Sequence, residues 1–164
     1  MERTQVRLYN ILLPIWLLWI FPQVWLVILP GNLVIDCAVL LLALAALRCA
    51  AKGAVLRRVW WRLWLNGFLA DAAGVAWMVL GMFAAAYGGA WWEENLTAIT
   101  GSPFRTPLAF AWTLAGVAIA GVCIYFLDRR SLRRCSELED RQRHGAALAL
   151  AVLTAPWLFL VPMY

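Results

Sequence analysis

The sequence predicts an all-α integral membrane protein with five transmembrane helices, its N-terminus in the cytoplasm and its C-terminus outside. Hydrophobic residues make up 65% of the 164 residues and charged residues only 14%, whereas soluble domains contain ~45–50% apolar and ~25% charged residues. Apolar runs long enough to cross a bilayer recur along the chain, and Lys and Arg gather in alternate connecting segments. We therefore expect one membrane domain over residues 1–164.

The predicted spans are five apolar runs, which cover residues 8–29, 33–51, 63–87, 107–127 and 145–164. Each run is predicted to be a helix, because a hydrocarbon environment requires every backbone group to find a partner within its own segment. Pro30-Gly31-Asn32 predicts a turn between the first two spans, with Asn32 as the N-cap of the second. Thr106-Pro107 predicts an N-cap followed by proline at the first position of the fourth helix.

Two short segments outside the spans are also predicted to be helical. Residues 90–100 carry two tryptophans, two glutamates and two aliphatic side chains, a composition that favours a short helix lying in the membrane interface. Residues 136–139 read Ser-Glu-Leu-Glu, which is a capping-box pattern. The fifth helix is therefore expected to begin on the cytoplasmic side, before it enters the bilayer.

The basic residues predict the orientation of the bundle. Thirteen of the fourteen Lys and Arg residues fall in the N-terminal segment, the second-to-third loop and the fourth-to-fifth loop, and Arg105 alone falls on the other side. The positive-inside rule places those three segments in the cytoplasm. We expect a bacterial-type plasma (inner) membrane as the location and anionic lipids at its cytoplasmic face as partners. Arginines that flank spans are explained by topology, so nucleic acid is not expected as a partner.

Ten of the eleven tryptophans divide into two groups. One group is predicted at the span boundaries, where amphipathic rings favour the headgroup level: Trp60, Trp61, Trp64, Trp91 and Trp92. The other group lies within spans and either fills the bundle or lines a pocket, for which the candidates are Trp16, Trp19, Trp77 and Trp157. Trp112 also lies within a span.

A polar site near the middle of the membrane is predicted around Asp71. Asp71 lies eight residues into the third predicted span, which corresponds to about 12 Å of helix rise in a hydrocarbon core of ~30 Å. Thr154 reaches a similar height of about 13–14 Å in the fifth span. Pro22 and Pro156 each lack an N–H group and so free a backbone carbonyl, that of Leu18 and that of Val152. These groups together resemble a cation or proton site between interrupted helices.

Asp36 is predicted to lie nearer the outer surface. Asn32 and Asp36 share one helix face four residues apart and form a candidate outer approach for a cation. The alternatives are structural: Asp36 interacts with a helix N-terminus, and Asp71 joins helices through hydrogen bonds. Asn66 either extends the polar path toward the cytoplasm or is only a polar residue at the membrane interface, without a role in the site.

The favoured function is a small transporter or channel-like protein for a cation or a proton-coupled small solute. The alternative is a membrane-embedded binding or accessory subunit that holds an apolar or aromatic ligand or docks a larger complex. An intramembrane enzyme is the weakest hypothesis, and no catalytic residue is assigned. A single histidine and the lack of a C-x-x-C motif predict no metal site and no cofactor. Small residues in the third and fourth spans predict packing between those helices or between copies in a homo-oligomer.

Overall fold

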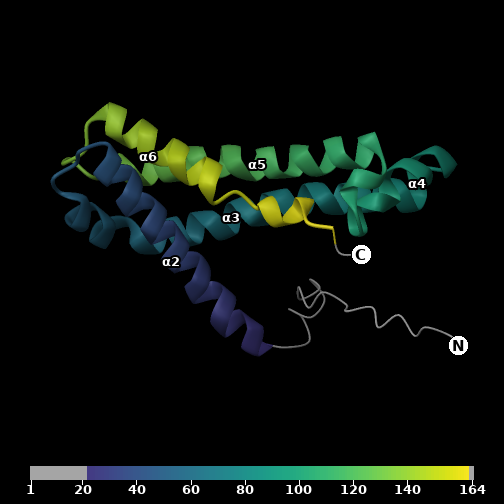
Figure 1. Ribbon diagram of the computed structural model, residues 1–164, viewed down its shortest axis with the longest axis horizontal. Coiled ribbons are helices and arrows are strands. Elements are labelled where there is room, and N and C mark those ends of the chain that lie inside the picture. Colours follow the sequence, from purple (N-terminus) through teal and green to yellow (C-terminus); the bar gives the residue numbers. More distant parts are fainter. Residues whose placement is uncertain (1–21, 163–164) are drawn as a thin grey trace, which may run out of the picture.

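The computed structural model describes residues 22–162, and these residues form helices with no strand among them (Figure 1). Four of the helical segments are long and apolar enough to cross a membrane: α2 (Pro22–Ala46), α3 (Lys52–Tyr87), α5 (Pro107–Leu132), and α6 (Asp140–Leu153) continued by the 3-10 helix η3 (Trp157–Leu160). The predicted all-α class is therefore confirmed. Residues 8–21, most of the first predicted span, lie outside the described residues.

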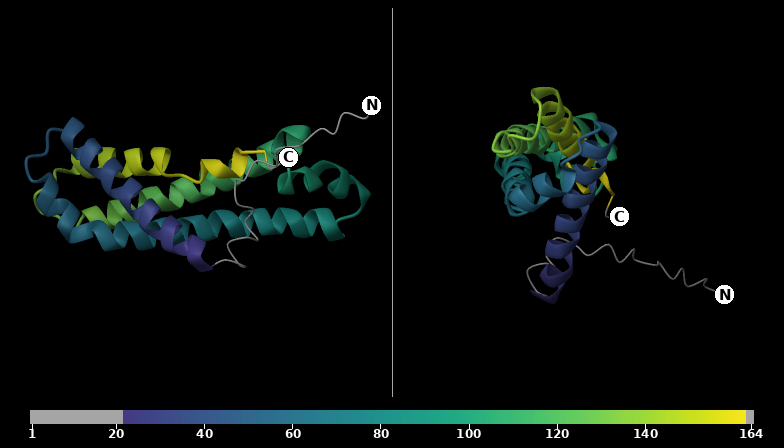
Figure 2. Two further views of the ribbon diagram at one scale, coloured as in Figure 1. Left: turned by 60° about the horizontal axis from the view of Figure 1, so that its bottom comes forward. Right: turned by 90° about the vertical axis from the view of Figure 1, so that its left-hand side faces the viewer.

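The long helices lie along one axis, except α2, which crosses the others obliquely (Figures 1 and 2). The α2–α3 and α5–α6 loops share one end of the bundle, and α4 (Ala90–Leu96), η1 (Thr97–Thr100) and η2 (Pro103–Arg105) form the other end. The helix predicted at residues 90–100 is thus present as α4 and η1. Gly89, with a φ of 95°, provides the tight turn between α3 and α4.

The turn predicted at Pro30-Gly31-Asn32 is absent, because α2 runs without interruption through these residues. A proline inside a helix removes one backbone hydrogen bond, whereas a turn in an apolar environment leaves several groups without partners. The helix also receives a bond from its neighbour, since the Trp64 indole donates to the Leu29 carbonyl at 3.1 Å. Asn32 is therefore a residue within α2 and not an N-cap.

The predicted fifth span is interrupted at its middle. The helix α6 begins at Asp140 and ends at Leu153, and a 3-10 turn follows Pro156. The capping box at its start is formed by Glu139 and Gln142, so the predicted box at residues 136–139 was wrong by three positions. The early start of the helix is nevertheless as predicted.

The third and fourth predicted spans both extend toward the basic end. The helix α3 begins at Lys52 instead of residue 63, and α5 continues to Leu132 instead of residue 127. The 36 residues of α3 correspond to about 54 Å, which exceeds a hydrocarbon core of ~30 Å. The arginine-bearing end of α3 therefore projects beyond the apolar part of the helix. At the start of α5, the Thr106 hydroxyl accepts from the Ala109 N–H at 3.2 Å, as predicted.

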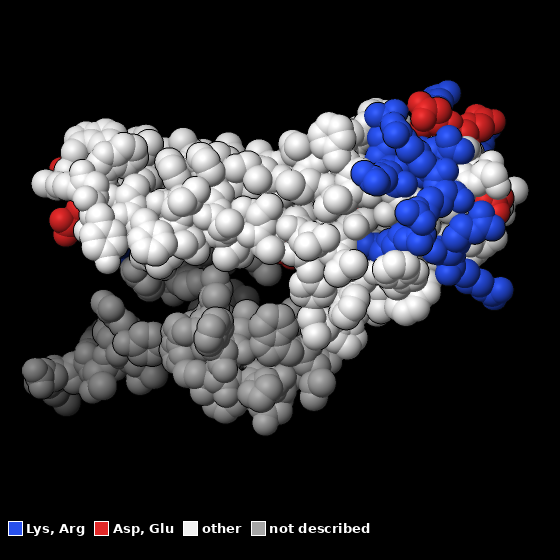
Figure 3. All heavy atoms as spheres, turned by 180° about the vertical axis from the view of Figure 1, so that it is seen from behind, with Lys and Arg blue, Asp and Glu red and all other residues white. Residues whose placement is uncertain are grey.

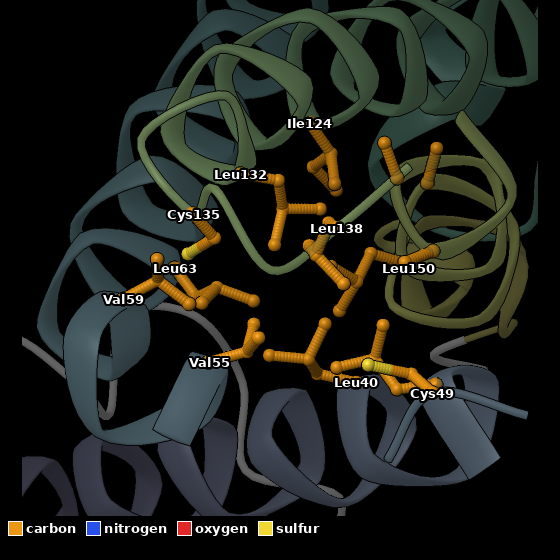
Figure 4. Packing of buried hydrophobic residues seen from close by; sticks show 14 of the residues in the cluster. Leu40, Cys49, Val55, Val59, Leu63, Ile124, Leu132, Cys135, Leu138 and Leu150 are labelled. Carbon is orange, nitrogen blue, oxygen red and sulfur yellow. The ribbon is translucent and has the colours of Figure 1, made fainter. Parts of the chain in front are cut away.

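The main apolar core lies at the basic end, where four helices meet (Figure 4). It includes Leu40 of α2, Leu63 of α3, Leu132 of α5 and Leu150 of α6, each at most 1% exposed. Farther along, α3 and α5 approach closely through small residues. A Cβ added at Gly74 would lie 3.2 Å from the carbonyl oxygen of Gly116. Small residues therefore allow α3 and α5 to pack closely, which was one of the two predicted alternatives.

Candidate functional site

The carboxyl group of Asp36 lies inside the bundle, against the backbone of α3. Asp36 is 9% exposed, and a Cβ added at Gly67 would lie 3.4 Å from its Oδ2 atom. The absence of a side chain at Gly67 thus allows the carboxyl group to sit against the helix. The continuous α2 puts Asp36 in the middle of a helix, so its expected position one turn from a helix N-terminus was wrong. The outer approach formed by Asn32 and Asp36 stays a prediction.

Thr154 lies beside Asp36, at the residue where α6 stops. The Thr154 side chain lies within interaction range of the Asp36 carboxyl group, and the Thr154 hydroxyl donates to the Leu150 carbonyl oxygen at 2.9 Å. Because α6 ends at Leu153, its last carbonyl groups need hydrogen-bond donors from outside the helix. The Val152 carbonyl, predicted to be freed by Pro156, accepts from the Trp157 indole at 2.8 Å.

Asp71 completes this group from the next turn of α3. It lies within electrostatic range of Asp36 and is half-buried. Asp71 follows Gly67 by four residues, which is about 6 Å of helix rise, so Asp36 lies on the basic-end side of Asp71. The structure thus brings together three of the predicted site residues, Asp36, Asp71 and Thr154, from three different helices.

A second polar group, which the sequence analysis missed, lies nearer the basic end. The Asn66 amide donates to Asp128 Oδ1 at 2.8 Å and to Ser131 Oγ at 3.0 Å, and all three side chains are less than 10% exposed. Asp128 was assigned to a loop because the apolar run ends at Leu127. The signal for its burial was present, however, since Asp128 follows Ala120 and Ile124 at intervals of four along the buried face of α5.

The two polar groups are close enough to interact. Asp36 lies within electrostatic range of both Asp71 and Asp128. We call these three carboxyl groups, which come from α2, α3 and α5, the acidic row: Asp36, Asp71 and Asp128. Among residues 22–162, the ion pairs are Arg58–Glu137 and Arg129–Asp140, and neither includes a member of the row. Within the same range, no three His, Cys, Asp or Glu side chains are arranged to hold a metal ion.

The remaining predicted residues occupy other positions. Trp77 and Trp112 are stacked with ring centroids 4.3 Å apart, and each indole donates to the backbone carbonyl of the other residue at 3.0 and 3.2 Å. Trp77 therefore joins α3 to α5 through both its ring and its N–H group. Trp157 is 48% exposed. Leu18, Trp16 and Trp19 lie outside the described residues.

These features define a helical protein with several membrane-length apolar helices and buried carboxyl groups between them. Compared with protein-family models, with curated proteins and with solved structures, the chain matches none. Its function is therefore argued from its own residues.

Proposed function

We propose that the protein is a small transporter or channel-like protein that moves a cation, or a small solute coupled to protons, through the acidic row. The observation that carries this proposal is the position of three carboxyl groups on three helices inside an apolar bundle, with no cationic partner among the described residues. Ionisable groups at membrane depth are costly unless they serve a pathway or a counter-ion.

The partners of Asp36 support movement of protons. A threonine hydroxyl carries a single proton, which Thr154 donates to the Leu150 carbonyl and which a rotation of the hydroxyl can redirect to the nearby Asp36. A protonated Asp36 can donate to Thr154 while Thr154 donates to Leu150, whereas an ionised Asp36 competes with the carbonyl for that proton. The hydrogen bonds at the break in α6 therefore change with the charge of Asp36.

The interruption of α6 supports a site at this level. Discontinuous helices surround the substrate and ion sites of many transporters, because unwound backbone supplies polar groups within the membrane. Here Thr154 is both the end of α6 and the partner of Asp36. The break therefore supplies one of the polar groups of the site.

We further propose that the four membrane-length segments of the described part cross a bacterial-type plasma membrane, with the basic end in the cytoplasm. Lys and Arg side chains gather at the end that holds the α2–α3 and α5–α6 loops (Figure 3). The positive-inside rule assigns such an end to the cytoplasm. In this orientation the Asn66–Asp128 pair lies on the cytoplasmic side of Asp36.

Flux through liposomes that contain the purified protein tests the transport proposal. Proton flux is followed with an internal pH-sensitive dye, and Na⁺ and K⁺ flux with isotopes, for wild type, Asp36→Asn and Asp71→Asn. Both variants keep the shape and remove the charge, so we expect flux to fall by about tenfold or more if ions cross this site.

The matched control is Asp140→Asn, which makes the same chemical change at a side chain that is 73% exposed. Its flux should equal that of wild type. Equal flux in all four proteins, or no flux of any of these ions through wild type above protein-free liposomes, contradicts the proposal.

A further inference from the structure

The exposed face of α3 changes its chemical character along the helix. It begins with exposed Arg57 and Arg58, continues with Trp61, which is 44% exposed, and then presents Leu65 and Leu69, which are 45% and 53% exposed. Residues four apart on a helix share a face. One face of α3 therefore passes from cationic to aromatic to aliphatic residues with distance from the basic end.

The neighbouring helix α5 shows the same order at the same end. Val122, Phe126 and Arg130 follow one another at intervals of four residues. Val122 is 55% exposed and Phe126 63% exposed, and Arg130 is also exposed. The two helices run in opposite directions (Figure 1). The aromatic residue therefore lies between the aliphatic and the cationic residues on both helices.

This order matches the layers of a bilayer leaflet. Aliphatic side chains favour the hydrocarbon core, aromatic rings favour the interface, and Arg reaches the phosphate level. A protein partner would not require both helices to repeat the order. The agreement between α3 and α5 therefore indicates that lipid covers the exposed faces of both helices.

Several cations on these faces have no acceptor within the described part of the chain. Arg58 is paired with Glu137, but no hydrogen bond or ion pair holds Arg57, Arg62 or Arg130 in residues 22–162. The Arg62 guanidinium lies over the Trp61 ring, 4.7 Å from its centroid. Stacking of this kind leaves the N–H edge of the guanidinium open to an anionic oxygen.

We propose that the exposed faces of α3 and α5 at the basic end bind the phosphate headgroups of anionic phospholipids, with Arg57, Arg62 and Arg130 as donors and with Trp61 and Phe126 at the level between these arginines and the aliphatic residues. The space-filling view shows Lys and Arg as a continuous band across this end (Figure 3). Charge complementarity selects an anionic leaflet over a zwitterionic one. The binding does not depend on transport.

Lipid titration of the full chain tests this site. The protein in a nonionic detergent is titrated with phosphatidylglycerol or phosphatidylcholine, and lipid adducts are counted by native mass spectrometry. We expect wild type to prefer phosphatidylglycerol and Arg62→Gln to weaken that lipid about fivefold, because one arginine near an anionic surface contributes on this scale. The triple variant Arg57→Gln, Arg62→Gln, Arg130→Gln should lose the preference.

The matched control is Arg105→Gln, which removes one positive charge at the opposite end of the bundle and should leave the affinity for phosphatidylglycerol unchanged. The melting temperature without lipid should be the same for wild type, Arg62→Gln and the triple variant, since Arg57, Arg62 and Arg130 make no ion pair in the described part. Equal affinity of wild type for both lipids overturns the proposal. An equal loss in Arg62→Gln and Arg105→Gln also overturns it, because net charge would then explain the binding.

Discussion

At the scale of single residues, the Asn66–Asp128–Ser131 cluster contains the shortest buried hydrogen bond between α3 and α5. Asp128 lies in an arginine-rich segment but is bonded to a neutral amide, and its side chain is 2% exposed. A buried carboxyl group is tolerated only when it is hydrogen-bonded. Asn66 therefore permits Asp128 to be buried at the inner edge of the acidic row.

The replacement Asn66→Leu should destabilise the fold by about 2–3 kcal/mol, because it leaves a buried acceptor without its donor. Reversible unfolding in mixed micelles, followed by tryptophan fluorescence, measures the loss. The double variant Asn66→Leu, Asp128→Leu is the control, since replacing both partners by apolar groups restores much of the stability. A single variant as stable as wild type would contradict the assigned role of the amide.

At the scale of elements, the packing of α3 on α5 depends on positions without side chains. A Cβ added at Gly81 would contact the Trp112 indole and lie 2.9 Å from Ile99 Cδ1. The stacked Trp77 and Trp112 rings with their two reciprocal hydrogen bonds lie one turn away. This part of the interface is close-packed, so even one methyl group has to displace a ring.

The replacement Gly81→Ala should therefore cost about 1–3 kcal/mol, the usual range for overpacking. The matched control is Gly53→Ala in the same helix, where an added Cβ has no neighbour within 4 Å. That variant should be as stable as wild type or gain up to about 1 kcal/mol from helix propensity. Thermal unfolding in detergent compares them, and equal melting temperatures would contradict the importance of this contact.

At the scale of the whole molecule, the two ends of the bundle differ in charge and in packing. The basic end holds the main apolar core and the arginine-rich loops, and the opposite end holds the smaller cluster of Leu96, Ile99 and Ala109 under α4 and η1. Both connections at the basic end lie on one side of the membrane, because α2 and α5 end there and α3 and α6 begin there. A single measurement can therefore establish which side that is.

Labelling of single added cysteines in intact bacterial cells measures the orientation. Glu94→Cys should react with a membrane-impermeant maleimide from outside, and Ser136→Cys only after permeabilisation. Both positions are exposed. The native Cys135 gives little background, because burial raises the pKa of its thiol and its side chain is 0% exposed. The reverse labelling pattern would place the basic end outside.

Much of the helical arrangement was predictable, because membrane-length helices depend on additive local properties. The apolar runs predicted α3 from residue 63 onward and α5 up to residue 127. The N-cap at Thr106 was correct to the residue. The site was predicted only in part. The structure brings Asp71 and Thr154 near Asp36, and their level in the membrane stays a prediction. Asp128 was missed, because the predicted fourth span ends at Leu127 whereas α5 continues to Leu132.

The sequence by itself determined which segments are apolar enough to cross a membrane and which loops carry the cations, since both follow from composition along the chain. The tertiary structure decided the rest. The depth of Asp36 depends on where α2 begins and how it crosses α3, and whether a proline interrupts a helix depends on neighbouring donors. Trp64 donates to α2 one residue before Pro30, where the helix continues, whereas Thr154 and Trp157 bond the carbonyls where α6 ends. The Trp64 contact joins residues 35 positions apart in the chain, so it arises only when α2 and α3 pack together.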